Sequence, residues 1–123
     1  MFDIDITKDS PSGIHVLTLS GECMFAEKAS ASEYFTQILE ESPKRVIIDL
    51  SKCSILDSSG IGMLAAYHMK LREKQSGARI AVVTGRNNYL IRKLSQLGIF
   101  KGMGIEVFKT FNEAKAALEK EHF

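Results

Sequence analysis

Residues 46–62 read VIIDLSKCSILDSSGIG, and this stretch determines the fold. Its first five residues, Val46–Leu50, form a short and nearly continuous apolar run, which is typical of a central strand covered on both faces. A polar loop is expected to lead from this strand to the DSSG quartet at 57–60. Because Asp and Ser commonly cap the first turn of a helix, the quartet predicts the start of the amphipathic helix that follows.

Strand and helix signals alternate on both sides of this stretch. Apolar alternation and β-branched runs predict strands at 4–7, 14–19, 46–50, 80–83 and 105–108. Apolar residues at helical spacing predict helices at 25–41, 58–75, 89–97 and 111–118. The turn cluster at 9–13 predicts an antiparallel hairpin, whereas strands joined through helices are expected to be parallel.

These signals together predict a single α/β domain over residues 1–123. Its sheet is expected to be mixed and mostly parallel, with an N-terminal antiparallel hairpin and about four helices. The chain has 45% hydrophobic and 25% charged residues, which is close to the average for a globular domain. This composition argues against a disordered tail, a collagen-like fibre and a disulfide scaffold.

Charge gives little indication of a polyanionic partner. The formal net charge is +1, which is too balanced to indicate nucleic-acid or membrane binding. The charges are unevenly placed, with −5 over residues 1–62 and +6 over residues 63–123. This asymmetry fits two solvated faces of opposite sign, or a partner surface with complementary charge.

The cysteines and the N-terminus favour a cytoplasmic protein. Cys23 and Cys53 are the only cysteines, and neither lies in a CxxC motif or beside a histidine. A zinc site needs about four ligands, so we expect no metal and interpret both cysteines as small buried apolar residues. No signal peptide and no run approaching ~18 apolar residues is visible, so no membrane association is expected.

Motifs of the common enzyme classes are missing from the sequence. It contains no GxSxG, GxxxxGK[ST] or HExxH pattern, so we expect no catalytic activity. His15, His68 and His122 lie far apart, and His68 is predicted to be a satisfied core residue. A receiver-like phosphoacceptor at Asp49 is disfavoured, because the first strand leads into a hairpin and lacks the acidic pair that holds Mg²⁺ in receivers.

The start of the helix at 58 suits a phosphorylation switch. The first turn of a helix has free backbone N–H groups and a partial positive charge, which hold a phosphate. Phosphorylation of a serine hydroxyl there would add about −1.5 to −2 charges, while Asp57 would repel them. Such a modification would alter a docking surface and leave the fold nearly unchanged. The alternative is that DSSG is only an ordinary helix cap.

The order of elements, the VIIDLS strand and the DSSGIG turn resemble the STAS domain of anti-sigma-factor antagonists. The resemblance covers nearly the whole chain. Gly21-Glu22 is similar to the family's G-E turn, and residues 94–100, LSQLGIF, are similar to its short segment before the last strand.

The resemblance implies a small regulator that binds a GHKL-type anti-sigma factor and serine kinase. Ser58 falls on the family's phosphoacceptor, with Ser59 as the next candidate. The unphosphorylated form would capture the kinase and free a sigma factor, phosphorylation would weaken that binding, and a PPM-type phosphatase would restore it. ATP would bind the kinase, so this chain is expected to need no cofactor.

One residue departs from the family's pattern. The family usually has an Asp two residues after the G-E pair, at the surface that meets the kinase. In this chain Met24 stands at that position, after Gly21-Glu22-Cys23. The partner could then be an anti-sigma kinase, or a partner-switching system that controls secretion, biofilm or another output. A STAS scaffold or transport-associated subunit that is not phosphorylated is a further alternative.

The helix that begins at 58 carries more candidate partner-binding residues. Gly60 and Gly62 each cost about 1 kcal/mol relative to alanine, and close approach of a partner or a neighbouring loop would be a reason to keep them. Met63 and Tyr67 lie one turn apart beside the buried stripe. They fit peripheral core, or an apolar patch that faces a partner next to Ser58.

Overall fold

The computed structural model describes residues 3–10, 12–24, 31–97 and 105–120. Its strands are β1 (Asp3–Lys8), β2 (His15–Cys23), β3 (Arg45–Leu56), β4 (Arg79–Val83) and β5 (Glu106–Phe108). Its helices are α1 (Ala31–Glu40), α2 (Ser58–Lys74), α3 (Asn88–Leu97) and α5 (Phe111–Glu119). These elements confirm the predicted order along the chain.

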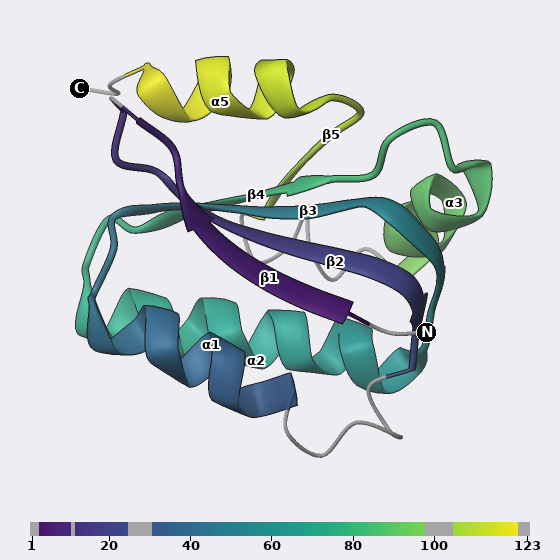
Figure 1. Ribbon diagram of the computed structural model, residues 1–123, viewed down its shortest axis with the longest axis horizontal. Coiled ribbons are helices and arrows are strands. Elements are labelled where there is room, and N and C mark those ends of the chain that lie inside the picture. Colours follow the sequence, from purple (N-terminus) through teal and green to yellow (C-terminus); the bar gives the residue numbers. More distant parts are fainter. Residues whose placement is uncertain (1–2, 11, 25–30, 98–104, 121–123) are drawn as a thin grey trace.

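The strands form one sheet in the order β1-β2-β3-β4-β5 (Figure 1). β1 pairs antiparallel with β2, with Ile4 opposite Leu19, and every later pair is parallel. The predicted mixed sheet with an N-terminal antiparallel hairpin is therefore confirmed. Because parallel strands end at the same edge, β2 and β3 both lead toward the start of α2 (Figure 1).

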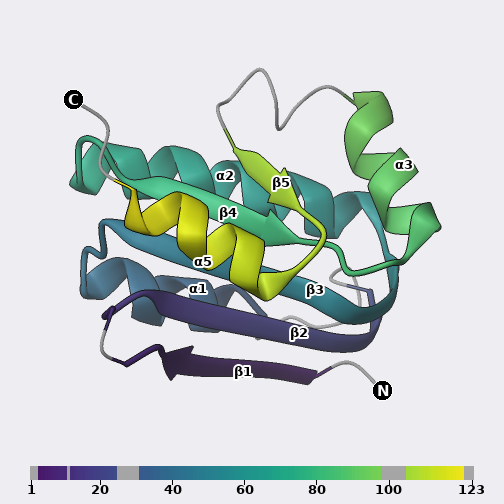
Figure 2. The same ribbon diagram turned by 90° about the horizontal axis from the view of Figure 1, so that it is seen from above.

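Helices cover both faces of the sheet. α1 and α2 lie on one face and α5 lies on the other, while α3 stands at one end (Figures 1 and 2). The α1 and α2 side holds the larger core, which includes Leu17, Ile48 and Leu64. The α5 side holds a smaller core that includes Ile47 and Leu118. The apolar run of β3 faces both layers, as expected for a central strand.

Two predicted loops are strand in the structure. The polar stretch at 51–56 continues β3 up to Leu56, and it pairs with the end of β2. Cys53 and Leu56 point into the core while most of their neighbours are exposed, so the stretch is half-buried strand. Gly21-Glu22 is likewise no turn: β2 continues to Cys23 through two register shifts, and Gly21 has φ +85°.

Some predicted boundaries lie outside the described residues. The helix expected over 25–41 is seen as α1 from Ala31, and residues 25–30 are outside the described part. Of the LSQLGIF segment, residues 94–97 belong to α3, and 98–100 are outside it as well.

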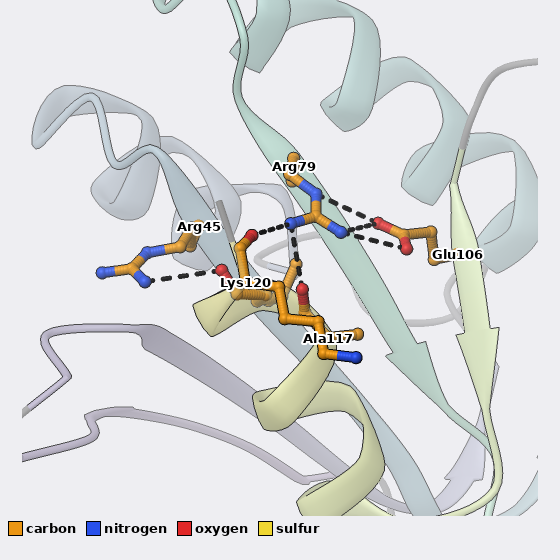
Figure 3. Close-up of polar contacts among 6 residues, drawn as sticks. Arg45, Arg79, Glu106, Ala117 and Lys120 are labelled. Carbon is orange, nitrogen blue, oxygen red and sulfur yellow. Dashed lines mark hydrogen bonds and ion pairs between the residues drawn. The ribbon is translucent and has the colours of Figure 1, made fainter. Parts of the chain in front are cut away.

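Two arginines fasten α5 to the sheet. Arg45 and Arg79 are neighbours in the register of β3 and β4. The guanidinium of Arg79 donates to the carbonyl oxygens of Ala117 and Lys120 at 3.0 and 3.2 Å, and Arg45 donates to that of Leu118 at 3.4 Å (Figure 3). Cations at the carbonyl end of a helix satisfy its unpaired acceptors and complement its dipole.

Candidate functional site

The site is built where β3 passes into α2. β3 ends at Leu56, α2 begins at Ser58, and Asp57 between them is the N-cap. The Asp57 carboxylate accepts a hydrogen bond from the backbone N–H of Gly60 at 2.8 Å. This cap fixes the first turn of α2 and the backbone that carries Ser58. The predicted capped helix is confirmed, without the loop that was expected before it.

Both serines of the quartet are exposed at this end of α2. Gly60 is buried, and its N–H is taken by the Asp57 carboxylate and carbonyl. Ser58 and Ser59 carry the first backbone N–H groups of the helix, where the dipole is positive. A hydroxyl in this place is open to an enzyme, and a phosphate on it would meet donors from the helix and repulsion from Asp57. The role of Ser58 as the acceptor stays a prediction.

The end of β2 lies directly beside this turn. The backbone N–H of Asp57 donates to the carbonyl oxygen of Cys23 at 3.3 Å, and Glu22 is opposite Ile55 in the register. Glu22 is exposed, and Met24 is half-buried just beyond the strand. The structure thus brings Glu22 and Met24 to the same end of the sheet as Ser58. Their spacing in the sequence did not indicate this.

The residues of α2 itself divide between surface and core. Gly62 is exposed, and a Cβ built on it would meet no atom within 4 Å. Internal packing therefore gives no reason for glycine at this position, and the close approach of a partner stays a prediction. Met63 is half-buried and packs on the edge of the core.

Tyr67 does not belong to the exposed surface. Its side chain is only 2% exposed, and its ring lies 5.0 Å from that of Phe35, at an interplanar angle of 58°. Burial also raises the pKa of the Tyr67 hydroxyl, because the charged form is poorly solvated there. The interpretation of Tyr67 as a partner-facing residue is wrong, since α1 covers the side of α2 on which it lies. His68 is buried at 2% exposure, as predicted for a core residue.

The two cysteines are joined, although the sequence predicted only small buried apolar residues. Both are buried, but they form a disulfide between the end of β2 and β3, with their Cα atoms 6.2 Å apart. In the register Gly21 lies opposite Cys53, and Cys23 follows two residues later on the neighbouring strand, past a register shift. They are 30 positions apart in the chain, and no motif indicated that they meet.

Residues 5–114 match the family profile described as STAS domain. The chain belongs to the STAS domain family. A curated relative, the anti-sigma-F factor antagonist RsfB of Mycobacterium tuberculosis, is 27% identical over 111 residues, covering 90% of this chain and 86% of its own.

Solved structures show the same STAS fold. An anti-sigma factor antagonist from Mycobacterium paratuberculosis superimposes with a TM-score of 0.82 at 23% identity, covering 98% of this chain and 96% of the other. The anti-sigma factor antagonist SpoIIAA in its unphosphorylated form gives a TM-score of 0.62 at 19% identity, with 96% of each chain covered. The complex of the diguanylate cyclase SiaD with its activator SiaC from Pseudomonas aeruginosa contains a chain that matches with a TM-score of 0.52 at 18% identity, covering 86% of this chain and 89% of the other.

This STAS domain also has residues near the site that no motif in the sequence indicated. Ile55 is 39% exposed at the end of β3, and Tyr89 is 43% exposed in the first turn of α3. The Asn87 amide donates to the carbonyls of Cys53 and Ser54 at 3.0 and 3.3 Å, and Lys93 Nζ donates to that of Leu56 at 2.8 Å. These bonds attach α3 to the strand that leads to Ser58.

A signal for part of this arrangement was present in the sequence. The Asn87 Oδ1 accepts from the backbone N–H groups of Tyr89 and Leu90, and Asn before an apolar run is a helix-start signal. Nothing in the sequence indicated that this cap lies against β3.

In the described part of the chain, no group of three or more His, Cys, Asp or Glu side chains is arranged to hold a metal, and no helix there is long and apolar enough to cross a membrane.

Proposed function

We propose that this STAS domain is a phosphorylation-controlled partner-switching protein that acts as an anti-sigma factor antagonist in the cytoplasm. In its unphosphorylated form it binds a GHKL-type anti-sigma factor that is also a serine kinase. Phosphorylation of Ser58 releases it, and a PPM-type phosphatase resets it. The chain itself catalyses nothing and needs no cofactor, because the kinase binds the ATP.

The observation that carries this proposal is the exposed Ser58 hydroxyl at the capped start of α2. The cap holds the serine backbone in one position, and exposure leaves the hydroxyl open to a kinase. The family match and a relative named as an anti-sigma-F factor antagonist support the same function.

The docking surface of the proposal consists of Glu22, Met24, Ser58, Ser59 and Gly62, all exposed or half-buried at one end of the sheet. A phosphate on Ser58 would place about two negative charges within this surface. The partner would then have to desolvate or neutralise them, which lowers its affinity. Ile55 and Tyr89 add exposed apolar area beside it, and apolar contacts are what the centre of an interface uses.

A second candidate is a partner switch with an output other than a sigma factor. Met24 stands where the family's kinase-facing acid is expected, so a partner with a basic contact at this point would lose its ion pair. The fold also matches a chain of a complex described as a diguanylate cyclase with its activator. In that case Ser58 would keep its role and the partner class would change.

Phosphate transfer from a purified GHKL-type serine kinase of the source organism tests the proposal. With radiolabelled ATP we expect one phosphate on Ser58, no label on Ser58→Ala, and full label on Ser59→Ala. Label retained by Ser58→Ala and lost by Ser59→Ala would move the acceptor to Ser59. No label on any form would favour a scaffold that is not phosphorylated.

A pull-down with and without ATP distinguishes the two outputs. An anti-sigma kinase is expected to be captured without ATP and to be released when ATP allows phosphorylation. Capture of a different effector with the same ATP response would support the second candidate.

A further inference from the structure

The disulfide lies in direct contact with the backbone of the site. Cys23 is the last residue of β2, and its carbonyl oxygen accepts the hydrogen bond from the N–H of Asp57, the N-cap of α2. Cys53 lies on β3, four residues before that cap. The crosslink therefore joins the strand that leads to Met24 with the strand that leads to Ser58.

We propose that Cys23 and Cys53 form a reversible thiol–disulfide switch that controls how firmly the docking surface around Ser58 is held. The inference rests on the proposed function, because it assigns a second form of regulation to the same surface. In the oxidised form, the end of β2 and the end of β3 are one covalent unit. In the reduced form, the end of β2 and the end of β3 are held by strand pairing, core packing and the bond from Asp57 to Cys23, without a covalent link.

The surroundings of the sulfurs suit both redox states. Cys53 Sγ lies 3.5 Å from the carbonyl oxygen of Leu19, and Cys23 Sγ lies 3.7 Å from that of Gly21. Both carbonyls belong to the irregular part of β2, where the register with β3 shifts. Thiol S–H groups are weak donors, so each reduced cysteine would find an acceptor already in place. Each thiol formed by reduction therefore has a carbonyl oxygen close by to accept its hydrogen bond.

The position of the pair suits reversible chemistry. Both cysteines are buried, at 0% and 3% exposure, but Cys23 is at a strand end, where local opening costs least. Lys52 and Ser54, on either side of Cys53, are exposed. In the cytosol, which the proposed function requires, disulfides are rare and those present are usually transient or redox-sensing. A purely structural crosslink would not be expected there.

The chemistry is an ordinary exchange with a low-molecular-weight thiol such as glutathione. One glutathione thiolate attacks a sulfur of the pair, the Cys23–Cys53 bond breaks, and a mixed disulfide forms. A second glutathione releases it. Two electrons and two protons convert the pair to two thiols, while two glutathione molecules become one glutathione disulfide. Oxidation by glutathione disulfide runs the same steps in reverse.

Loss of the crosslink is expected to weaken docking. A surface held in its bound arrangement binds more tightly, because less ordering is required when the partner arrives. The reduced form must order Met24 and the N-cap turn on binding. Oxidation is therefore expected to favour partner capture and reduction to favour release, independently of the phosphate on Ser58.

Amide hydrogen exchange of the intact chain in glutathione buffers of varied reduced-to-oxidised ratio tests this without any partner. Thiol alkylation and mass measurement report the fraction of disulfide at each ratio. On reduction we expect exchange about tenfold faster at the hydrogen-bonded amides of Met24, Asp57 and Gly60, and unchanged exchange in β4 at 79–83. The Cys23→Ser/Cys53→Ser variant should exchange at the rates of the reduced form, and these rates should not change with the glutathione ratio. Ser58→Ala should respond as the wild type does.

Three results would overturn the inference. These are a pair that stays as thiols in oxidised glutathione, a disulfide that reduced glutathione does not open, and equal exchange at Asp57 and Gly60 in both forms. None of them depends on phosphorylation. Failure of the Ser58 labelling experiment with a working redox response would instead remove the proposed function and leave the switch in place.

Discussion

Arg79 of β4 and Glu106 of β5 are joined by a forked ion pair, with Nη2 of the arginine 2.8 Å from Oε2 of the carboxylate. The Nε of the same arginine also donates to this carboxylate, at 3.2 Å. Since the guanidinium binds the end of α5 as well, one side chain fixes both the short edge strand and the last helix (Figure 3). Only arginine has a planar group that can donate several hydrogen bonds at once to a carboxylate and to backbone carbonyls.

Arg79→Lys should therefore destabilise the protein. An ammonium group reaches one acceptor at a time, so we expect the free energy of unfolding to fall by about 1–3 kcal/mol in urea denaturation. Arg86→Lys is the matched control, because Arg86 is exposed, and it should change stability by less than about 0.5 kcal/mol. Equal effects of the two substitutions would show that the fork contributes little.

Gly85 and Gly62 offer a second matched pair. Gly85 has φ +67°, and a Cβ built on it would lie 3.0 Å from the Cβ of Ser51, so Gly85→Ala should cost about 1–3 kcal/mol of unfolding free energy. Gly62→Ala is in a helix with open space around it and should gain up to about 1 kcal/mol. Thermal unfolding measures both. If a partner approaches closely at Gly62, its alanine variant should be more stable and yet bind the kinase less tightly.

Ser58→Glu should weaken kinase binding and leave the fold intact. The added carboxylate places charge within the docking surface, next to Asp57, while Ser58 makes no core contact. Ser58→Ala should bind constitutively, because it cannot be modified. Isothermal titration with the purified kinase compares the three forms, and circular dichroism confirms that each is folded. Equal affinity of wild type and Ser58→Glu would contradict the prediction.

Met24→Asp should change partner preference with little effect on stability. Met24 is half-buried at the end of β2, so a charge there stays near solvent and meets the partner directly. We expect tighter binding to a kinase with a basic contact at this point, measured as a ratio of affinities for two purified kinases. A large fall in the thermal midpoint would show instead that Met24 is a core residue.

Stability should depend on pH through Asp9. The hydroxyl of Ser12 and the ammonium of Lys115 hold the pKa of the Asp9 carboxyl below its ordinary value of 3.8. The Ser12 bond, at 2.6 Å, lies within the β1–β2 loop, and the Lys115 ion pair, at 3.0 Å, links this loop to α5. A lowered pKa means that the folded form prefers the charged carboxylate, so the contribution is present above about pH 4 and disappears as the pH falls through the lowered pKa.

The difference in stability between wild type and Asp9→Asn measures this contribution. We expect wild type to be the more stable at pH 7 and the difference to shrink below about pH 4. Urea denaturation at a series of pH values follows it. A difference that does not change with pH would mean that the Asp9 charge has no part in the link.

Local chemistry made the centre of the fold predictable. The apolar run at 46–50 predicts a strand by itself, because a strand covered on both faces must be apolar. The DSSG quartet predicts a helix start, because the first turn of a helix needs a capping residue. The predicted capped start of α2 and the central strand both agree with the structure.

What could not be predicted depended on pairing between distant strands. Residues 51–56 have the polarity of a loop, yet β2 supplies the hydrogen-bond partners that make them strand. The meeting of Cys23 with Cys53 depends on the same pairing of β2 with β3, which the sequence does not show. The sequence left Tyr67 open between peripheral core and a partner-facing patch for a similar reason, because helical spacing gives the side of α2 on which it lies but not how far α1 covers it.

The bond between Cys23 and Cys53 closes a covalent ring that contains α1 and the apolar half of β3 but no residue of α2. A protease that nicks the oxidised chain within residues 24–52 would leave both fragments attached, and they would separate on a gel only after a reductant is added. A nick within 58–74 would divide the polypeptide at once.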